Sequence, residues 1–365
     1  MTSYEQIRLA EDQTSTNVVV SEPASVPYIP VSPKTTRNTM LAVVAGMLLA
    51  AGAVFAIDTL DDTIKNPEEL RRRFNLPILG MIASHQTPEN KPITQVEPRS
   101  PISEAFRTLR TNITYAAVDR PLRRIMVTSP TPKDGKTTVS SSLAVVLGQA
   151  ERQVVLIDAD LRRPQIHRRF GIHNRIGLAD LFVRPLDALT GMVKSVDVPG
   201  LAVITSGALP PNPAELLTSQ KMIDILDRLN QDFDLILIDT PPVLAVTDAA
   251  ALAPAMDGVI LVAKPGTTKL SAFQQTVVQL RSVGARILGV VLNEVNPVSR
   301  KYGYYYNRYY SKYSYHYQQP ATQPVKTKPQ EKIFQPEPDK VLQDEVGIIY
   351  PAEPDQILPH IRFKH

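Results

Sequence analysis

The chain has 365 residues, of which 43% are hydrophobic, and a formal net charge of +4. This allows one large domain with appendages, and the mild positive charge suits an anionic ligand or membrane surface without by itself indicating nucleic acid. The sequence has no cysteine, which excludes disulfides, thiolate chemistry and cysteine-based zinc sites, and its six histidines show no metal-ligand spacing.

An apolar run near the N-terminus departs from the pattern of a soluble domain. Residues 40–57 contain no polar side chain and would span roughly 27 Å as a helix, close to the hydrocarbon thickness of a bilayer. This predicts one transmembrane helix. A buried core helix and a signal peptide are the alternatives, and the position of the run argues against the signal peptide. Residues 1–39 are predicted to be a tail whose Pro-rich part, 23–33, is stiff and non-helical.

Basic residues flank this run unequally. Lys34 and Arg37 lie before it, whereas Lys65 and the arginines at 71–73 lie after it. The positive-inside rule therefore predicts a single-pass protein of the inner (plasma) membrane, with residues 1–39 extracytoplasmic and the C-terminal side cytoplasmic.

Residues 58–102 are predicted to be a cytoplasmic juxtamembrane region and linker. A short helix should start near Asn66 and Pro67, because proline is favoured in the first turn of a helix. A Pro-rich linker, 88–101, precedes a helical pattern, and we place the start of the folded domain at Ser103.

Residues 103–298 alternate between short β-branched runs and helical stretches. Near-continuous runs of valine, isoleucine and leucine indicate strands buried on both faces. The alternation therefore predicts an α/β domain with a doubly wound, mostly parallel sheet and helices on both faces. The predicted strands are 124–128, 153–158, 201–205, 234–239, 258–263 and 286–292. The clearest predicted helices are 137–150, 213–230 and 269–283.

A phosphate-binding loop is predicted directly after the first of these strands. The segment 129–138, SPTPKDGKTT, keeps the end of the Walker A pattern, with Pro130 in place of its first glycine. N–H groups at the helix start and the helix dipole favour phosphate, the lysine would neutralise the β- and γ-phosphates, and the threonine would sit on Mg²⁺. A chance Gly-Lys-Thr turn is the alternative. The predicted nucleotide-binding residues are Lys133, Asp134, Gly135, Lys136, Thr137 and Thr138.

Three aspartates follow two further strands. Asp158 and Asp160 share a face of the second strand if it stays extended, and Asp239 ends the fourth. Ligands of open parallel sheets bind beyond the carboxyl ends of the strands, so these carboxylates should converge near Lys136. A lone strand-end aspartate is often a helix cap, but three around one phosphate loop predict a site for Mg²⁺ and a nucleotide.

With these motifs the chain resembles the bacterial tyrosine kinases, the P-loop kinases of capsule and exopolysaccharide assembly, from about residue 15 to residue 317. The family's Walker A′ motif is matched by LIDADLRRP at 156–164, and also typical of the family are SGALPPNPAELL at 206–217 and IDTPPVLAVTDA at 238–249. The N-terminal part is similar to the C-terminal end of a polysaccharide co-polymerase, or chain-length determinant. The usual first transmembrane helix and long extracytoplasmic region are missing, which indicates a truncated co-polymerase or an incorrectly assigned start.

The resemblance implies a membrane-anchored autokinase that uses ATP and Mg²⁺ to phosphorylate the tail of a neighbouring subunit, and so regulates exopolysaccharide or capsule polymerisation and export. The expected partners are that machinery, the membrane and a phosphotyrosine phosphatase, with no nucleic acid. Thr137, Asp160 and Asp239 are expected at Mg²⁺, Asp239 by holding the metal's water shell, and Asp158 is expected to accept the tyrosine proton; these last two roles can be exchanged. The predicted catalytic residues are Lys136, Asp158, Asp160 and Asp239.

The helical pattern at the start of the domain carries a further motif. Glu104, Arg107 and Arg110 are spaced by three residues and therefore lie on one stripe of a helix. A solvated face with intrahelical salt bridges is one interpretation. The resemblance implies instead an intersubunit contact that builds a ring of kinase domains.

A tyrosine cluster occupies residues 299–317, in which nine of the chain's thirteen tyrosines lie among Lys, Arg, Ser, Asn and His. So many rings are not expected to join a core, because each buried hydroxyl would need a partner. The hydroxyls are predicted autophosphorylation sites, and each phosphate would add about −1.5 to −2 charges and favour disassembly of the ring. The sites are Tyr302, Tyr304, Tyr305, Tyr306, Tyr309, Tyr310, Tyr313, Tyr315 and Tyr317. Residues 318–365 are predicted to be a disordered tail.

Three other functions would use parts of the same sequence. A partition- or septum-type ATPase shares the P-loop and sheet, but usually has a second lysine where this chain has Thr131, and lacks a tyrosine tail. A scaffold of polysaccharide export that only binds nucleotide is kept open by Lys133 and Asp134, where the family often has Gly and a small or acidic residue. An RNA-stacking role of the aromatic, basic tail has no support in the predicted domain.

Overall fold

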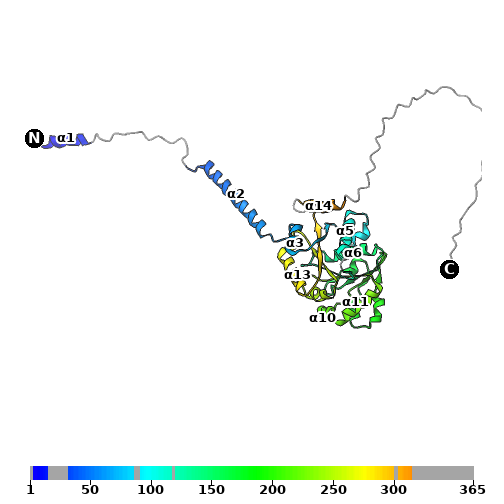
Figure 1. Ribbon diagram of the computed structural model, residues 1–365. Coiled ribbons are helices and arrows are strands. Elements are labelled where there is room, and N and C mark those ends of the chain that lie inside the picture. Colours follow the sequence, from blue (N-terminus) through cyan, green and yellow to red (C-terminus); the bar gives the residue numbers. More distant parts are fainter. Residues whose placement is uncertain (1–2, 15–31, 86–90, 117–119, 300–302, 315–365) are drawn as a thin grey trace, which may run out of the picture. The chain divides into compact units, whose positions relative to one another are not determined.

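The computed structural model describes residues 3–14, 32–85, 91–116, 120–299 and 303–314 (Figure 1). The strands are β1 (Ile78–Ala83), β2 (Arg124–Thr128), β3 (Val154–Asp158), β4 (Lys194–Ser195), β5 (Leu201–Ile204), β6 (Leu235–Asp239), β7 (Gly258–Ala263) and β8 (Ile287–Val295). The helices are α1 (Ser3–Thr14), α2 (Thr35–Leu60), α3 (Pro67–Phe74), α4 (Ile93–Val96), α5 (Pro101–Ala116), α6 (Lys136–Gly148), α7 (Ile166–Arg169), α8 (Leu178–Leu181), η2 (Leu186–Ala188), α9 (Leu189–Met192), α10 (Pro213–Thr218), α11 (Gln220–Asp232), α12 (Asp248–Leu252), η3 (Ala253–Ala255), α13 (Leu270–Ser282) and α14 (Gly303–Ser314).

One eight-stranded sheet forms the centre of the domain, in the order β1-β8-β7-β2-β6-β3-β5-β4. Neighbouring strands pair in parallel, except β4 and β5, which are antiparallel at one edge. The predicted mostly parallel sheet is confirmed, and each of the predicted strands is present. β2, β6 and β3 are neighbours in the sheet. Their carboxyl ends carry the predicted phosphate loop and the predicted carboxylates.

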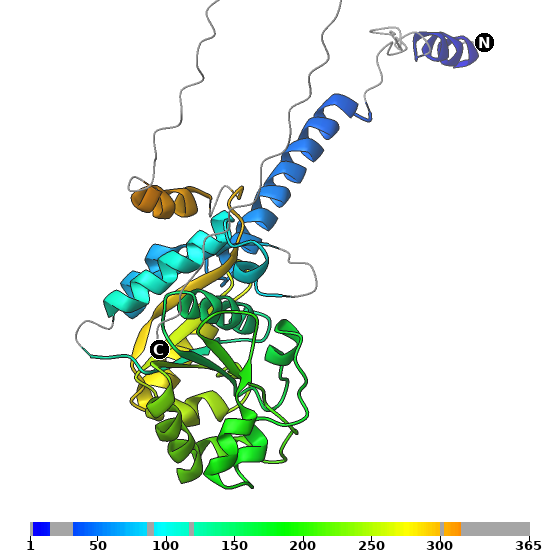
Figure 2. The ribbon, with the colours of Figure 1, turned by 90° about the vertical axis from the view of Figure 1, so that its right-hand side faces the viewer.

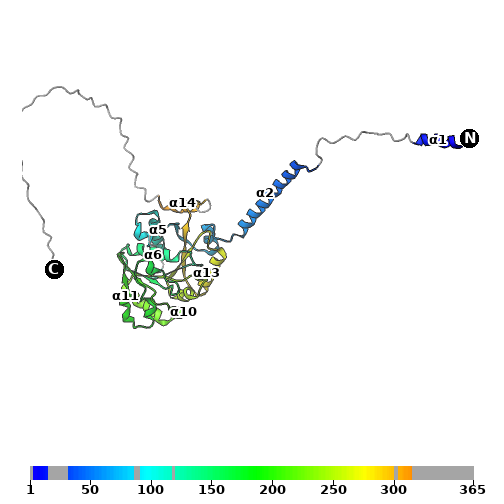
Figure 3. The ribbon, with the colours of Figure 1, turned by 180° about the vertical axis from the view of Figure 1, so that it is seen from behind.

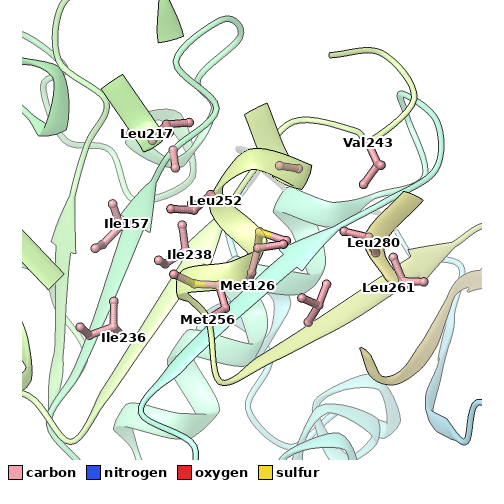
Figure 4. Packing of buried hydrophobic residues seen from close by; sticks show 14 of the residues in the cluster. Met126, Ile157, Leu217, Ile236, Ile238, Val243, Leu252, Met256, Leu261 and Leu280 are labelled. Atoms are coloured by element: carbon pink, nitrogen blue, oxygen red, sulfur yellow. The ribbon is translucent and has the colours of Figure 1, made fainter. Parts of the chain in front are cut away.

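Helices cover both faces of the sheet (Figure 1, Figure 2 and Figure 3). Side chains of α11 and α13 belong to one core cluster, and those of α5 and α6 to the other. Within β6, Ile236 and Ile238 lie in the first cluster, shown in Figure 4, and Leu235 and Leu237 in the second. Because both faces of the strand are buried, its sequence is an unbroken apolar run.

The domain includes residues that the sequence assigned to the linker 58–102. β1 pairs in parallel with β8, and Leu70 and Phe74 of α3 are buried in the core. The folded domain therefore does not start at Ser103. A parallel edge strand has its partner far away along the chain, so no local pattern identified β1.

Side-chain caps mark the starts of α3 and α11, two helices that the sequence predicted in part. The Asn66 side chain accepts a hydrogen bond from the N–H of Glu68 at 2.8 Å, so α3 starts where the sequence indicated. The predicted helix 213–230 is instead two helices, because extended Ser219 separates α10 from α11 and its hydroxyl accepts a hydrogen bond from the N–H of Met222.

The apolar run forms α2, which has 26 residues and extends the predicted 40–57 in both directions. None of its residues is buried, and by length and composition it can cross a membrane. Of the predicted Pro-rich approach, residues 23–31 lie outside the described part of the chain.

Part of the tyrosine cluster joins the core, contrary to the prediction. The rings of Tyr306, Tyr309 and Tyr310, on α14, pack against the buried clusters, and two of their hydroxyls find backbone acceptors. The other predicted sites divide into Tyr305, which is half-buried on α14, and those whose positions or side chains are not described: Tyr302, Tyr304, Tyr313, Tyr315 and Tyr317.

Candidate active site

The loop between β2 and α6 is shaped by a glycine in a left-handed conformation. Gly135 has a φ of +93° and is the N-cap of α6, without a side-chain cap. A Cβ atom at this position would lie 1.9 Å from Nδ2 of Asn293. That amide donates a hydrogen bond to the Asp134 carbonyl at 3.2 Å. Only glycine fits here, and the first N–H groups of α6 are left for an anion.

Gly135→Ala should therefore lower the free energy of unfolding more than Gly284→Ala. Both glycines have positive φ, at a cost of about 1–2 kcal/mol for alanine, but Gly284 has no atom within 4 Å of the added Cβ. At Gly135 the Asn293 amide must also move, which adds about 1 kcal/mol or more. Urea denaturation of both variants measures the difference, and equal losses would contradict the close approach.

Lys136 lies at the centre of the predicted carboxylates. Its Nζ is 2.8 Å from Oδ2 of Asp160 and 3.9 Å from Oδ2 of Asp239, and it donates a hydrogen bond to the Thr137 hydroxyl at 3.3 Å. Burial acts to lower the pKa of Lys136, but Asp239 and Asp160 outweigh it and raise the pKa. The lysine is therefore charged, as a phosphate ligand must be.

The Asp239 carboxylate is buried and organises the start of α6. Its Oδ2 accepts a hydrogen bond from the Thr137 hydroxyl at 2.7 Å, and its Oδ1 accepts one from the Ser140 hydroxyl at 3.1 Å. Burial raises the pKa of Asp239, although Lys136 opposes the shift. The side chain thus orients the hydroxyl that was predicted at Mg²⁺.

Asp158 and Asp160 do not share a face, because β3 ends at Asp158. The Asp158 carboxylate is fully buried and accepts hydrogen bonds from the N–H groups of Gln165 and Ile166 at 3.1 and 3.0 Å. Burial, followed by the charge of Asp239, raises the pKa of Asp158 to about 8. At neutral pH this carboxyl group holds a proton, whereas Asp160 carries the contact to Lys136.

A pocket of about 720 Å³ opens beside these residues, a volume that suits a nucleotide. Of the predicted residues, Lys133, Gly135, Lys136, Thr137, Thr138 and Asp160 line it. Asp158 and Asp239 lie behind this lining. The Asp134 side chain is turned away, because it accepts hydrogen bonds from Thr131 and, at 2.6 Å, from the Thr268 hydroxyl, so it braces the loop.

Arginines that the sequence did not single out also line the pocket. Arg162 forms a bidentate ion pair with Asp248, in which Nε donates to Oδ2 at 2.8 Å and Nη2 donates to Oδ1 at 3.0 Å. Arg169 donates to the Thr138 hydroxyl at 2.8 Å, and Arg163 lies between the two along the chain. The run LRRPQIHRRF that follows β3 could have identified these arginines, since basic residues beyond a strand end suit phosphate.

The residues at the pocket fit Mg²⁺ bound with phosphates. The Asp160 carboxylate and the Thr137 hydroxyl line the pocket, and Asp239 contacts the hydroxyl from behind. Magnesium is usually held by one or two carboxylates together with substrate phosphates. Among the described residues, no group of three or more His, Asp or Glu side chains is arranged to hold a metal by itself.

The three residues of the predicted ring motif have partners within the chain. Arg107 pairs with Glu104 at 2.8 Å and donates a hydrogen bond to the Pro98 carbonyl. Arg110 donates to the carbonyl of Val146 at 2.9 Å, near the C-terminal end of α6. Glu104 remains exposed at the surface, whereas Arg110 joins α5 to α6.

Comparisons with known proteins match the region of the chain that contains this site. A family model described as ParA, NUBPL iron-transfer P-loop NTPase, matches residues 122–325. Tyrosine-protein kinase YwqD of Bacillus subtilis is 39% identical over 214 residues, which cover 58% of this chain and 90% of YwqD. The solved kinase domain of Escherichia coli tyrosine kinase ETK shares 32% identity with a TM-score of 0.60, over 65% of this chain and 96% of that one.

Longer relatives extend beyond the matched region. Tyrosine-protein kinase etk of Escherichia coli K12 is 33% identical over 321 residues, which cover 82% of this chain but 44% of etk. The chain thus spans less than half the length of such relatives.

Proposed function

Because this chain belongs to the bacterial tyrosine kinase family and has the P-loop NTPase fold, we propose that it is a protein tyrosine kinase whose acceptor is the tyrosine cluster of a neighbouring copy. The observation that carries the proposal is the network of Lys136, Thr137, Asp160 and Asp239 at the start of α6, beside a pocket of nucleotide size. The cluster in the same chain supplies the hydroxyls.

In the proposed reaction, a phenolic oxygen bonds to the γ-phosphorus of ATP. The bond from that phosphorus to the β–γ bridging oxygen breaks, ADP leaves, and the phenolic proton passes to a carboxylate. Asp158 is the proposed acceptor and acts through its ionised fraction, because its pKa of about 8 gives the carboxylate the proton affinity for this role. Lys136 and the N–H groups of α6 hold the phosphates, and Thr137, Asp160 and Asp239 would hold Mg²⁺, which neutralises phosphate charge when bound.

Transfer between copies is supported by the position of α14. Its tyrosines contact β1, which β8 and β7 separate from β2. At ~4.8 Å per strand spacing, β1 lies roughly 14 Å from β2, the strand that carries the phosphate loop. The described tyrosines of α14 do not line the pocket of their own chain.

Several finer assignments belong to this proposal. α2 anchors the kinase domain in the plasma membrane with the domain in the cytoplasm, and the motif of Glu104, Arg107 and Arg110 contributes to a ring of copies. Phosphorylation of the cluster then regulates exopolysaccharide polymerisation and export, in contact with that machinery, and a phosphatase reverses it. The similarity to tyrosine-protein kinases etk and YwqD supports the activity.

The test is to incubate the purified full-length chain in detergent with Mg–ATP and probe for phosphotyrosine. The signal should disappear in Lys136→Met. A mixture of Lys136→Met with an active chain whose cluster tyrosines are all phenylalanine should regain phosphotyrosine, because acceptor and enzyme are then different copies. ATP hydrolysis without phosphotyrosine would instead indicate a partition-type ATPase, and neither activity a nucleotide-binding scaffold.

A further inference from the structure

The tyrosines of α14 form a small aromatic cluster on the domain. The rings of Tyr306 and Tyr310 lie 4.7 Å apart, and those of Tyr309 and Tyr310 lie 5.3 Å apart at nearly a right angle. Tyr310 contacts the core clusters of both sheet faces. Such contact is possible only at an edge of the sheet, and β1 is its terminal strand. α14 therefore covers the edge at β1.

Two tyrosine hydroxyls bond to the backbone of that strand. The Tyr309 hydroxyl donates to the Leu79 carbonyl at 3.0 Å, and the Tyr310 hydroxyl donates to the Met81 carbonyl at 2.5 Å. Asn112 of α5 donates to the same Leu79 carbonyl at 2.8 Å and to the Tyr309 hydroxyl at 3.1 Å. Backbone groups of an edge strand need such partners, and here the partners are the proposed phosphoacceptors.

These contacts require an unmodified hydroxyl. Phosphorylation replaces the phenolic proton, so Tyr309 and Tyr310 would no longer donate to the carbonyls of Leu79 and Met81. The phosphate would also bring about −1.5 to −2 charges towards carbonyl oxygens, which carry partial negative charge themselves. A hydroxyl bonded to β1 is in turn unable to enter a kinase pocket. Docking and phosphorylation exclude each other at these two positions.

A cavity lies beside the docked helix. A cavity of about 410 Å³ remains between α3, β1 and α14, lined by Glu68, Arg71 and Tyr305 among others. The ion pair that spans it, Arg308 to Glu68, is 3.8 Å long with both side chains substantially exposed, so it contributes little.

We propose that the surface formed by β1 and Asn112 is a docking site for the unphosphorylated tyrosine helix, distinct from the phosphoryl-transfer pocket, which withholds Tyr309 and Tyr310 until α14 leaves. The occupant is the chain's own α14. Phosphorylation of either tyrosine then prevents the helix from docking again and leaves the β1 edge uncovered. The timing of phosphorylation rests on the proposed kinase function, but the docking itself does not.

The first experiment measures docking without catalysis. In the full-length Lys136→Met chain, amide hydrogen exchange of residues 303–314 is followed by mass spectrometry. Asn112→Ala should reduce protection about two- to tenfold, since one neutral hydrogen bond is worth roughly that factor. Tyr309→Phe combined with Tyr310→Phe removes two such bonds and should reduce protection about four- to hundredfold. Tyr306→Phe is the matched control, because it also keeps a packed ring but removes a hydroxyl that makes no hydrogen bond with the described residues, and it should leave protection unchanged. Equal protection in all variants would overturn the docking site.

The second experiment measures the order of modification in the active full-length chain with Mg–ATP. Tyr309 and Tyr310 should be phosphorylated about tenfold more slowly than Tyr315 and Tyr317. Asn112→Ala, which removes one of the hydrogen bonds that hold the helix, should reduce this difference. Asn112 lies outside the pocket lining, so the total rate should persist. Equal initial rates at the four tyrosines in the chain without substitutions would contradict the proposal that docking withholds Tyr309 and Tyr310. Absence of phosphotyrosine at every site would instead contradict the kinase function, and the exchange experiment would still decide the docking.

Discussion

Lys136→Met is expected to reduce phosphorylation of the tyrosine cluster by roughly a thousandfold or more. The Lys136 side chain is 13% exposed, and its Nζ contacts Asp160 and approaches Asp239. The positive charge therefore lies beside the pocket that phosphates would enter. Removal of one preorganised charge or donor from such a site typically costs two to three orders of magnitude or more, because transition-state charge is then left without compensation.

A second lysine of the same loop provides the control. Lys133 also lines the pocket, but its side chain is exposed to solvent. Lys133→Met should therefore change the initial rate by less than about tenfold, since contacts of exposed charges are screened. The measurement is the initial rate of phosphotyrosine formation for both variants at saturating Mg–ATP. Equal losses in the two would show that loop charge in general, and not Lys136, supports transfer.

Arg162→Gln should destabilise the domain by about 3 kcal/mol, in addition to any loss of activity. Asp248 is fully buried, and Arg162 neutralises it through two hydrogen bonds. Removal of one partner of such a pair leaves an uncompensated buried charge, which costs about 3–5 kcal/mol, and the partial exposure of Arg162 favours the lower value. Urea denaturation measures the loss, and Arg163→Gln, an exposed neighbour at the same pocket, should change stability by less than about 0.5 kcal/mol.

The double variant separates stability from function. Asp248→Asn combined with Arg162→Gln removes both charges and should recover most of the lost stability, because no buried charge then remains. Phosphorylation should not recover, because Arg162 lines the pocket and Asp248 positions it there. If the double variant regained activity together with stability, Arg162 would be a structural residue only.

Local patterns were sufficient for most of the fold and part of the site. The central strands were predicted because burial on both faces makes them continuous apolar runs, and the phosphate loop because Gly135, Lys136 and Thr137 are adjacent in the chain. Asp158 and Asp239 were predicted at one edge of the sheet, and β3 and β6 do end at these paired residues. Burial raises the pKa of both carboxyl groups, that of Asp158 to about 8, and Lys136 opposes the shift at Asp239.

Contacts between distant segments decided the remainder. The pair of Arg162 and Asp248 joins residues 86 positions apart, and the bond from Tyr309 to Leu79 joins residues 230 apart. The sequence identified the tyrosine run and its chemistry, but it indicated no core for the run to join. Only the folded sheet brings the β1 edge beneath α14, because a parallel edge strand takes its partners from the far end of the chain.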